Sequence, residues 1–139
     1  MVKLIEINGD LFKTKSHLAH CVSSDFKMGA GIALQFKKMF GAIDPSKVVT
    51  NPGEIAVMKT GNHFIYYLVT KRFYYHKPNY NDLVETLRKM CTHMVNHNLN
   101  ELSIPRIGCG LDKLSWEIVK SHILDVFRNT DIEITVYSV

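Results

Sequence analysis

Two glycine-rich segments are the residues best suited to holding a ligand. Gly29-Ala30-Gly31 precedes a helical pattern, and Gly108-Cys109-Gly110 lies between a short apolar run and another helical pattern. Glycine lets a backbone approach a ligand closely, so its N–H groups can point at phosphate oxygens, and a helix N-terminus adds a favourable dipole. A single loop of this kind is often only a turn between a strand and a helix, in which glycine is needed for steric reasons. Two of them favour a ligand with two phosphates, or one large ligand held on both sides.

Neither glycine segment completes a known nucleotide-binding motif. The sixth position of a G-x-G-x-x-G pattern is Leu34 in the first segment and Lys113 in the second, and the sequence holds no G-K-[ST]. The pattern therefore argues against a Rossmann site, and no P-loop is present.

Lys71 and Asp112 are the candidate catalytic residues. Lys71 ends a predicted strand, and Arg72, His76 and Lys77 follow closely. A lysine is nucleophilic only as the free amine, which burial or neighbouring cations favour; alternatively, the basic residues form a solvated strand edge. Asp112 directly follows the second glycine segment, where a carboxylate can act as general acid or base on a sugar. The alternative for Asp112 is an ordinary acid at a helix N-terminus.

Other polar residues carry weaker signals. Asp10 follows the first predicted strand, where a carboxylate can accept hydrogen bonds from an adenine amine or a ribose hydroxyl; the alternative is an Asx turn. His93 and His97 are four residues apart, but Met94 stands where H-E-x-x-H needs Glu, so we expect surface histidines and no metal site. A helix start can lower the pKa of a thiol such as Cys109, yet no base accompanies it.

The elements that must position these residues alternate along the chain. We expect Gly41 to end the first helix, the second helix to begin near Asn79 or Asn81, and Ser115 to cap the third helix. Residues 60–62 are expected to form the turn of a hairpin. Expected strands cover residues 2–7, 18–22, 54–59, 63–70, 102–104 and 132–137, and expected helical faces lie within 32–40, 83–94 and 119–127. This β-β-α-β-β-α-β-α-β order predicts an α/β fold with helices on both faces of a mixed sheet.

The composition is that of an ordinary globular protein. The 139 residues suit one domain, residues 1–139, with 46% hydrophobic and 22% charged residues. Seventeen Lys and Arg against thirteen acids give a net charge of +4, which suits an anionic partner. No apolar run approaches the roughly 18–20 residues of a membrane span, and three cysteines without a C-x-x-C pair argue against a disulfide framework. We expect a soluble intracellular protein with no membrane partner.

Several motifs together resemble the macrodomain family of ADP-ribose-binding modules. They are Asn8-Gly9-Asp10-Leu11-Phe12, Leu18-Ala19-His20-Cys21-Val22-Ser23, Met28-Gly29-Ala30-Gly31-Ile32-Ala33, Thr70-Lys71-Arg72, His76-Lys77-Pro78 and Pro105-Arg106-Ile107-Gly108-Cys109-Gly110-Leu111-Asp112. The resemblance extends from the first strand to Thr135-Val136-Tyr137 and is most specific in the block from Pro105 to Asp112. It implies a three-layer α/β/α macrodomain with a mixed central sheet of about six strands.

The resemblance also implies a place for ADP-ribose. Adenine would lie near Asp10 and Leu11, with Val139 bordering its pocket, while the distal ribose would reach Ser23, Lys71 and Asp112. The pyrophosphate would lie between the two glycine segments, on Gly29, Ala30, Gly31, Ile32, Arg106, Ile107, Gly108, Cys109, Gly110 and Leu111.

Members of this family remove ADP-ribose from glutamate and aspartate side chains with a lysine nucleophile and an aspartate acid/base. If the family's roles apply to the matching residues here, Lys71 would attack C1″ of the distal ribose and displace the carboxylate. Asp112 would assist proton transfer while water releases ADP-ribose. The resemblance further implies deacylation of O-acetyl-ADP-ribose, and no cofactor or metal. It implies action on ADP-ribosylated proteins in the DNA damage response, in the nucleoplasm and nucleolus, with the cytoplasm as a second location. Nothing in the sequence suggests an oligomer, so we expect a monomer.

Two other functions stay open at this point. A macrodomain can bind ADP-ribose without turnover, although such a reader has no need of Lys71 and Asp112 together. The same site chemistry can also remove ADP-ribose from DNA bases, although no predicted helix carries a basic stripe and no known nucleic-acid motif appears. The segment Phe73-Tyr74-Tyr75 is more aromatic than the family pattern, so it bears on the choice of substrate.

Overall fold

A computed structural model describes residues 1–48 and 51–138, so the predicted adenine-pocket residue Val139 lies outside the described residues. One six-stranded sheet forms the centre, with strand order β1-β6-β5-β2-β4-β3. The strands are β1 (Lys3–Asn8), β2 (His17–Ser23), β3 (Ile55–Thr60), β4 (His63–Lys71), β5 (Glu101–Ile104) and β6 (Glu133–Ser138). The helices are α1 (Gly31–Phe40), α2 (Tyr80–Asn96) and α3 (Trp116–Phe127), with short 3-10 turns at Leu11–Lys13 and Pro45–Lys47.

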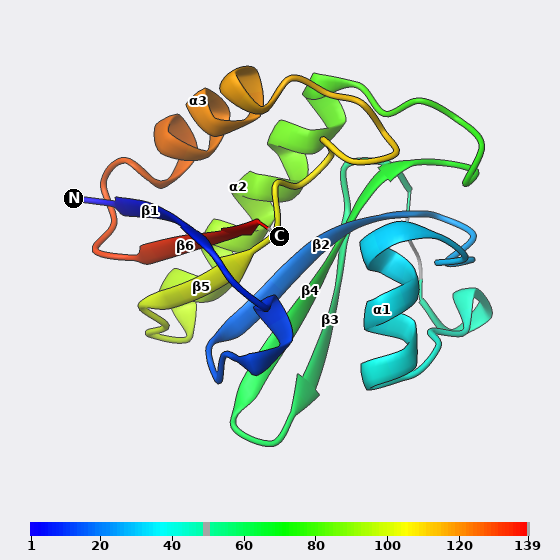
Figure 1. Ribbon diagram of the computed structural model, residues 1–139, viewed down its shortest axis with the longest axis horizontal. Helices are drawn as coiled ribbons and strands as arrows, with labels where there is room; N and C mark the ends of the chain where they lie inside the picture. Colours follow the sequence, from blue (N-terminus) through cyan, green and yellow to red (C-terminus); the bar gives the residue numbers. More distant parts are fainter. Residues whose placement is uncertain (49–50, 139) are drawn as a thin grey trace.

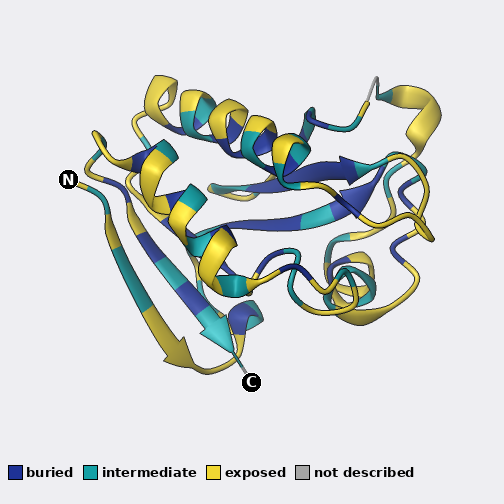
Figure 2. Cartoon of the chain, turned by 90° about the horizontal axis from the view of Figure 1, so that it is seen from above, coloured by how far each residue is buried: buried dark blue, intermediate teal, exposed yellow. Residues whose placement is uncertain are grey.

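The helices form two layers on opposite faces of the sheet, with α2 and α3 together on one face and α1 on the other (Figure 1). Side chains alternate between the two faces along β4: Tyr66 and Leu68 pack towards α2 and α3, whereas Ile65, Tyr67 and Val69 pack towards α1. The predicted three-layer α/β/α fold and the mixed sheet are confirmed. Figure 2 shows the central strands buried between the layers and β1 largely exposed at the edge.

Five strands of the sheet run in the same direction. The pairs β1–β6, β6–β5, β5–β2 and β2–β4 are parallel, and only β3 runs antiparallel, in the predicted hairpin with β4. The carboxyl ends of the five parallel strands therefore meet at one edge. The loops that follow β1, β2, β4 and β5 all leave the sheet there, and ligands bind at such an edge in open α/β sheets.

The observed boundaries match the predicted elements within one or two residues, and two caps are confirmed. Asn79 caps α2 by accepting a hydrogen bond from the Asp82 N–H, and Gly41, at φ 93°, ends α1. Ser115 is the N-cap residue of α3, as predicted, but its hydroxyl makes no capping hydrogen bond. Its N–H instead donates to the Tyr80 hydroxyl, 3.0 Å away, which fastens the start of α3 to the start of α2. Among the described residues, none of the helices has the length and apolar character of a membrane span.

Candidate active site

Lys71 and Asp112 form an ion pair at the shared strand edge. Lys71 is the last residue of β4, Asp112 lies in the loop after β5, and Lys71 Nζ lies 2.5 Å from Asp112 Oδ1. Only 13% of the lysine side chain and 18% of the aspartate side chain are exposed. The sheet order explains the pairing, because β2 alone separates β4 from β5 and the ends of both strands point the same way. A short amine–carboxylate pair that is mostly shielded from water is suited to passing a proton between its partners.

Hydrogen bonds from the neighbouring strand hold the backbone of Lys71. Ser23 pairs with Lys71 across a register shift that follows Val22, and the Ser24 N–H donates to the Lys71 carbonyl at 2.9 Å. The hydroxyl of Ser23, predicted to face the distal ribose, donates to Asp25 Oδ1 at 2.5 Å, and the residue is 5% exposed. Ser23 thus lies beside Lys71, with its side chain turned to Asp25.

Asp25 organises the loop between β2 and α1. Its Oδ1 also accepts from the Lys27 N–H at 3.2 Å, and its Oδ2 accepts from the Tyr74 N–H at 3.2 Å, which ties this loop to the one after β4. Burial raises the pKa of Asp25, but the hydrogen bonds from Ser23, Lys27 and Tyr74 outweigh burial and hold that pKa below its usual value. The sequence analysis missed Asp25, although an aspartate two residues beyond a strand end is a common turn signal.

Buried apolar side chains anchor the same loop in a strained conformation. Phe26 and Met28 have φ of 49° and 47°, and each is only 4% exposed. Side chains rarely adopt this left-handed region unless packing around them compensates for the strain. The loop therefore delivers the exposed segment Gly29–Gly31 to the start of α1 in a defined position. Ala30, the residue before α1, makes no side-chain cap, so the first-turn N–H groups stay available to an anion.

The second glycine segment turns tightly and meets the first. Gly108 has φ 73°, and a Cβ there would lie 2.9 Å from Leu114 Cδ1. The turn is closed by a hydrogen bond from the Leu114 N–H to the Gly108 carbonyl at 2.8 Å. Leu111 reaches across to Gly31, where a Cβ would lie 3.2 Å from Leu111 Cδ1. The two segments predicted to hold one ligand from both sides are therefore neighbours.

Gly29 and Gly110 differ from the other glycines of these segments. A Cβ on either would have no neighbour within 4 Å, and neither has a positive φ. The fold therefore does not require glycine at these two positions. Close approach of a ligand to the backbone is a physical reason for glycine there.

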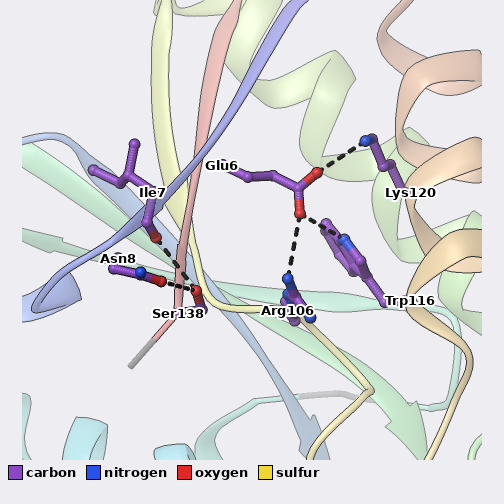
Figure 3. A network of polar contacts seen from close by, with 7 residues as sticks. All are labelled: Glu6, Ile7, Asn8, Arg106, Trp116, Lys120 and Ser138. Carbon is purple, nitrogen blue, oxygen red and sulfur yellow. Dashed lines mark hydrogen bonds and ion pairs between the residues drawn. The ribbon is translucent and has the colours of Figure 1, made fainter.

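The guanidinium of Arg106, predicted to bind pyrophosphate, belongs to a network centred on Glu6 of β1 (Figure 3). Glu6 accepts hydrogen bonds from Lys120 Nζ and Trp116 Nε1, each at 2.9 Å, and the Arg106 guanidinium lies 3.6 Å from its Oε1. Hydrogen bonds from Lys120 and Trp116 lower the pKa of Glu6. The network joins β1, the start of the β5–α3 loop and α3. It positions the backbone that leads to Gly108.

The remaining predicted substrate residues occupy different environments. Asp10 accepts from the Phe12 N–H at 2.9 Å, so it makes the Asx turn that was its alternative, and it stays exposed. Ile32 is half-buried and packs against the hydrophobic core between α1 and the sheet. Leu11 and Ile107 are core residues, with 4% and 2% of their surface exposed. The side chains of Leu11 and Ile107 are therefore buried and not available to a ligand.

The cysteines near the ion pair are unsuited to nucleophilic chemistry. Burial raises the pKa of the Cys109 thiol, whose Sγ donates to the Ile107 carbonyl at 3.3 Å, so the candidate lowered pKa is wrong. Burial also raises the pKa of Cys21, which lies in β2 near Asp112.

Within residues 1–48 and 51–138, no group of three His, Cys, Asp or Glu side chains is placed to hold a metal ion. His93 instead bonds the Tyr66 hydroxyl at 2.7 Å and stacks on His97.

Comparisons with known proteins agree with this architecture. The family model described as "Macro domain" matches residues 19–123. The chain is 48% identical over 140 residues to the human protein "ADP-ribose glycohydrolase OARD1", covering 98% of this chain and 91% of the relative. It superposes on the "Macrodomain of Thermus aquaticus DarG" with a TM-score of 0.88 at 23% identity, each chain covered in full. A TM-score of 0.83 at 21% identity relates it to "Thermosipho africanus DarTG in complex with ADP-ribose", over 97% of this chain and 41% of that one. On this evidence, the chain belongs to the macrodomain family.

Proposed function

We propose that this protein is an ADP-ribose glycohydrolase that releases ADP-ribose from modified glutamate and aspartate side chains. The observation that carries the proposal is the ion pair of Lys71 and Asp112, 2.5 Å apart at the edge where the two glycine segments meet. The near full-length similarity to a relative named an ADP-ribose glycohydrolase supports it. In this proposal the pyrophosphate binds between Gly29–Gly31 and Gly108–Gly110, and the distal ribose extends to the ion pair.

The ion pair can supply both chemical roles. Transfer of one proton from Lys71 Nζ to Asp112 Oδ1 gives a free amine beside a carboxylic acid. The amine forms a bond to C1″ while the C1″–oxygen bond to the glutamate breaks, and the glutamate leaves as a carboxylate. Water then replaces the amine at C1″, so that Lys71 leaves as its ammonium form and ADP-ribose is freed. Asp112 releases the proton that it took from Lys71 to solvent, which restores the ion pair. The carboxylate leaving group is already stable, so one amine and one carboxylate suffice.

The same pair is proposed to remove the acetyl group of O-acetyl-ADP-ribose as a side activity. A reader of ADP-ribose without turnover is the main alternative, and nothing about binding alone requires a lysine and an aspartate in contact and mostly shielded from water. The nuclear location, the monomeric state, the role in DNA damage and the DNA substrate remain predictions drawn from the family resemblance.

The test compares wild type with Lys71→Ala and Asp112→Ala. Release of free ADP-ribose from a glutamate-modified protein is followed over time, and ADP-ribose affinity is measured by calorimetry. Arg128→Ala is the control, because it also breaks an ion pair, with Asp125 at 2.6 Å, on the exposed end of α3. We expect each site variant to lose about 10²-fold or more in rate while binding persists, and the control to match wild type. Undiminished release by Lys71→Ala would refute the nucleophile, and wild type that binds without release would identify a reader.

A further inference from the structure

A cavity borders the ion pair on the side of the β4–α2 loop. Its volume is about 370 Å³, and its lining is Pro52, Thr70, Lys71, Arg72, His76, Lys77, Asn79 and Asp82. Among the described residues assigned to ADP-ribose above, Lys71 alone contributes to this lining. When ADP-ribose lies on the glycine segments with its distal ribose at the ion pair, the cavity therefore stays open to the group that carries the ADP-ribose.

That group is a polypeptide if the proposed function holds. The modified glutamate or aspartate has to place its carboxylate at the ion pair, while the backbone on either side of it stays at the protein surface. A carboxylate side chain spans only a few ångströms, so the residues next to the modified one lie over the surface that borders Lys71. The cavity and the loop after β4 are part of that border.

This border carries uncompensated positive charge. Arg72 and Lys77 are exposed, and within the described part of the chain neither has a salt-bridge partner. Among the described lining residues the one acid, Asp82, already accepts a hydrogen bond from Asn79 Nδ2 at 3.0 Å. Arginine can pair with a carboxylate through two parallel hydrogen bonds, and lysine supplies a second cation. The charge therefore complements carboxylates at positions next to the modified glutamate.

Aromatic rings that pack on one another form the rest of the loop surface. Phe73, Tyr74 and Tyr75 are 41%, 57% and 69% exposed. The rings of Phe73 and Tyr75 are parallel within 2°, with centroids 5.6 Å apart, and the His76 ring meets both edge-on, at 5.2 and 4.8 Å. The His76 N–H also donates to the Phe73 carbonyl at 3.0 Å, which closes a turn. Such an exposed cluster indicates a contact surface, and tyrosine and arginine are enriched where proteins bind one another.

Hydrogen bonds fix this loop relative to the ion pair. The Tyr74 N–H donates to Asp25 Oδ2 at 3.2 Å, and Asp25 Oδ1 accepts from the hydroxyl of Ser23, which pairs with Lys71 in the sheet. The loop surface is thus formed before a ligand arrives, which reduces the entropy lost on binding.

We propose that the segment Arg72–Lys77 binds an acidic polypeptide segment, namely the residues that flank the modified glutamate in the substrate protein. The inference rests on the proposed function and deepens it, because it names the sequence context that the enzyme prefers. Carboxylates of flanking residues pair with Arg72 and Lys77, and the ring cluster contacts the backbone and the side-chain stems between them.

The packing of the rings favours a polypeptide over a nucleic acid. Proteins that hold single nucleic-acid strands stack successive bases on open ring faces. Here Phe73 and Tyr75 stack on each other, and Lys27 Nζ lies over the Tyr74 ring, 5.5 Å from its centre. These faces are already covered, so the cluster is better suited to contact with a polypeptide than to stacking with bases. An apolar polypeptide would leave Arg72 and Lys77 unpaired, which favours an acidic one.

The test compares two peptides of equal length that carry the same ADP-ribosylated glutamate. One has aspartate and glutamate at the flanking positions, and the other has serine and glutamine there. The kcat/KM for release of ADP-ribose is measured for wild type, for the basic variant Arg72→Ala/Lys77→Ala and for the ring variant Phe73→Ser/Tyr75→Ser. The control Arg88→Ala/Lys89→Ala removes the same two residue types from exposed positions of α2.

We expect wild type and the control to prefer the acidic peptide by about 3- to 30-fold in kcat/KM, because each exposed ion pair contributes modestly. The preference should shrink as the salt concentration rises, since exposed charges are screened. The basic variant should lose the preference, and the ring variant should lose about fivefold or more on the acidic peptide. Arg72→Glu/Lys77→Glu should instead favour a peptide flanked by lysine, a gain that misfolding cannot produce.

Equal kcat/KM of wild type on the two peptides, or a preference that the basic variant retains, overturns the subsite and leaves the proposed function standing. Wild type that releases ADP-ribose from neither peptide refutes the proposed function. The subsite is then decided by anisotropy of a fluorescent unmodified acidic peptide with ADP-ribose present, because binding requires no turnover; loss of binding in the basic variant alone supports it. Single-stranded DNA is titrated in the same assay. If binding of DNA depends on Arg72 and Lys77 while binding of the peptide does not, the surface takes a nucleic acid and the proposal is overturned.

Discussion

Substitution of three loop glycines, Gly29, Gly108 and Gly110, by alanine should separate the one that the fold requires from the two that a ligand requires. Gly108 has φ 73°, and an added Cβ would lie 2.9 Å from Leu114 Cδ1. The left-handed conformation costs alanine about 1–2 kcal/mol, and crowding adds about 1 kcal/mol because Leu114 is a side chain that can shift. Gly108→Ala should therefore lose about 2–3 kcal/mol of unfolding free energy. For a chain of this length, that lowers the melting temperature by about 6–12 °C.

Gly29→Ala and Gly110→Ala are the matched counterparts. Neither residue has a positive φ, and a methyl group at either would meet no atom within 4 Å. Alanine restricts the unfolded chain more than glycine does, so each variant should be as stable as wild type or up to about 1 kcal/mol more stable. A methyl group in this space would obstruct a pyrophosphate approaching the backbone. We expect each to bind ADP-ribose about tenfold more weakly, which corresponds to about 1.4 kcal/mol.

Thermal unfolding measures the stability of the three variants, and calorimetric titration of the same preparations measures their affinity for ADP-ribose. We expect Gly108→Ala to lose stability, and Gly29→Ala and Gly110→Ala to lose affinity instead. Wild-type affinity in both of the latter variants would show that no ligand approaches those backbones. Wild-type stability in Gly108→Ala would show that the steric argument at that turn is mistaken.

Two further predictions concern residues that support the site. Burial lowers the pKa of His20 from 6.5 to about 3, so the unfolded chain takes up a proton below pH 6.5 while the folded chain does not, and stability is lost as the pH falls from 6.5. Between pH 7.5 and 5.5, wild type should lose about 1.4 kcal/mol more than His20→Phe in urea unfolding, and parallel losses would contradict the assignment. Asp25→Ala should release the loops on both sides of Lys71 and lower the hydrolysis rate about tenfold or more, because small misplacements of reacting groups are costly. Asp44→Ala, which removes a comparable cap from an exposed turn, should keep the wild-type rate, and equal effects would count against positioning by Asp25.

Patterns of a few neighbouring residues predicted most of the fold. The hydrophobic period of 3.6 identified the three helices, and the hairpin followed from Thr60-Gly61-Asn62, where Gly61 has φ 57°. Ser115 is the N-cap residue of α3 as predicted, but its hydroxyl makes no capping bond, and no sequence pattern reports that its N–H bonds the Tyr80 hydroxyl, 35 residues away. The lowered pKa considered for Cys109 failed for a similar reason, since its burial depends on packing.

The sequence by itself determined the order of strands and helices, the two glycine segments and the presence of a lysine and an aspartate beside them. Those features are local, because turn residues and apolar periods act within a few positions of the chain. Only the tertiary structure decided that Lys71 and Asp112, 41 residues apart, form a shielded ion pair. The contact depends on the sheet order, which inserts β2 between β4 and β5. The links from Asp25 to Tyr74 and from Glu6 to Arg106 likewise depend on which strand ends become neighbours, since hydrogen bonds and ion pairs form over a few ångströms of space regardless of separation along the chain.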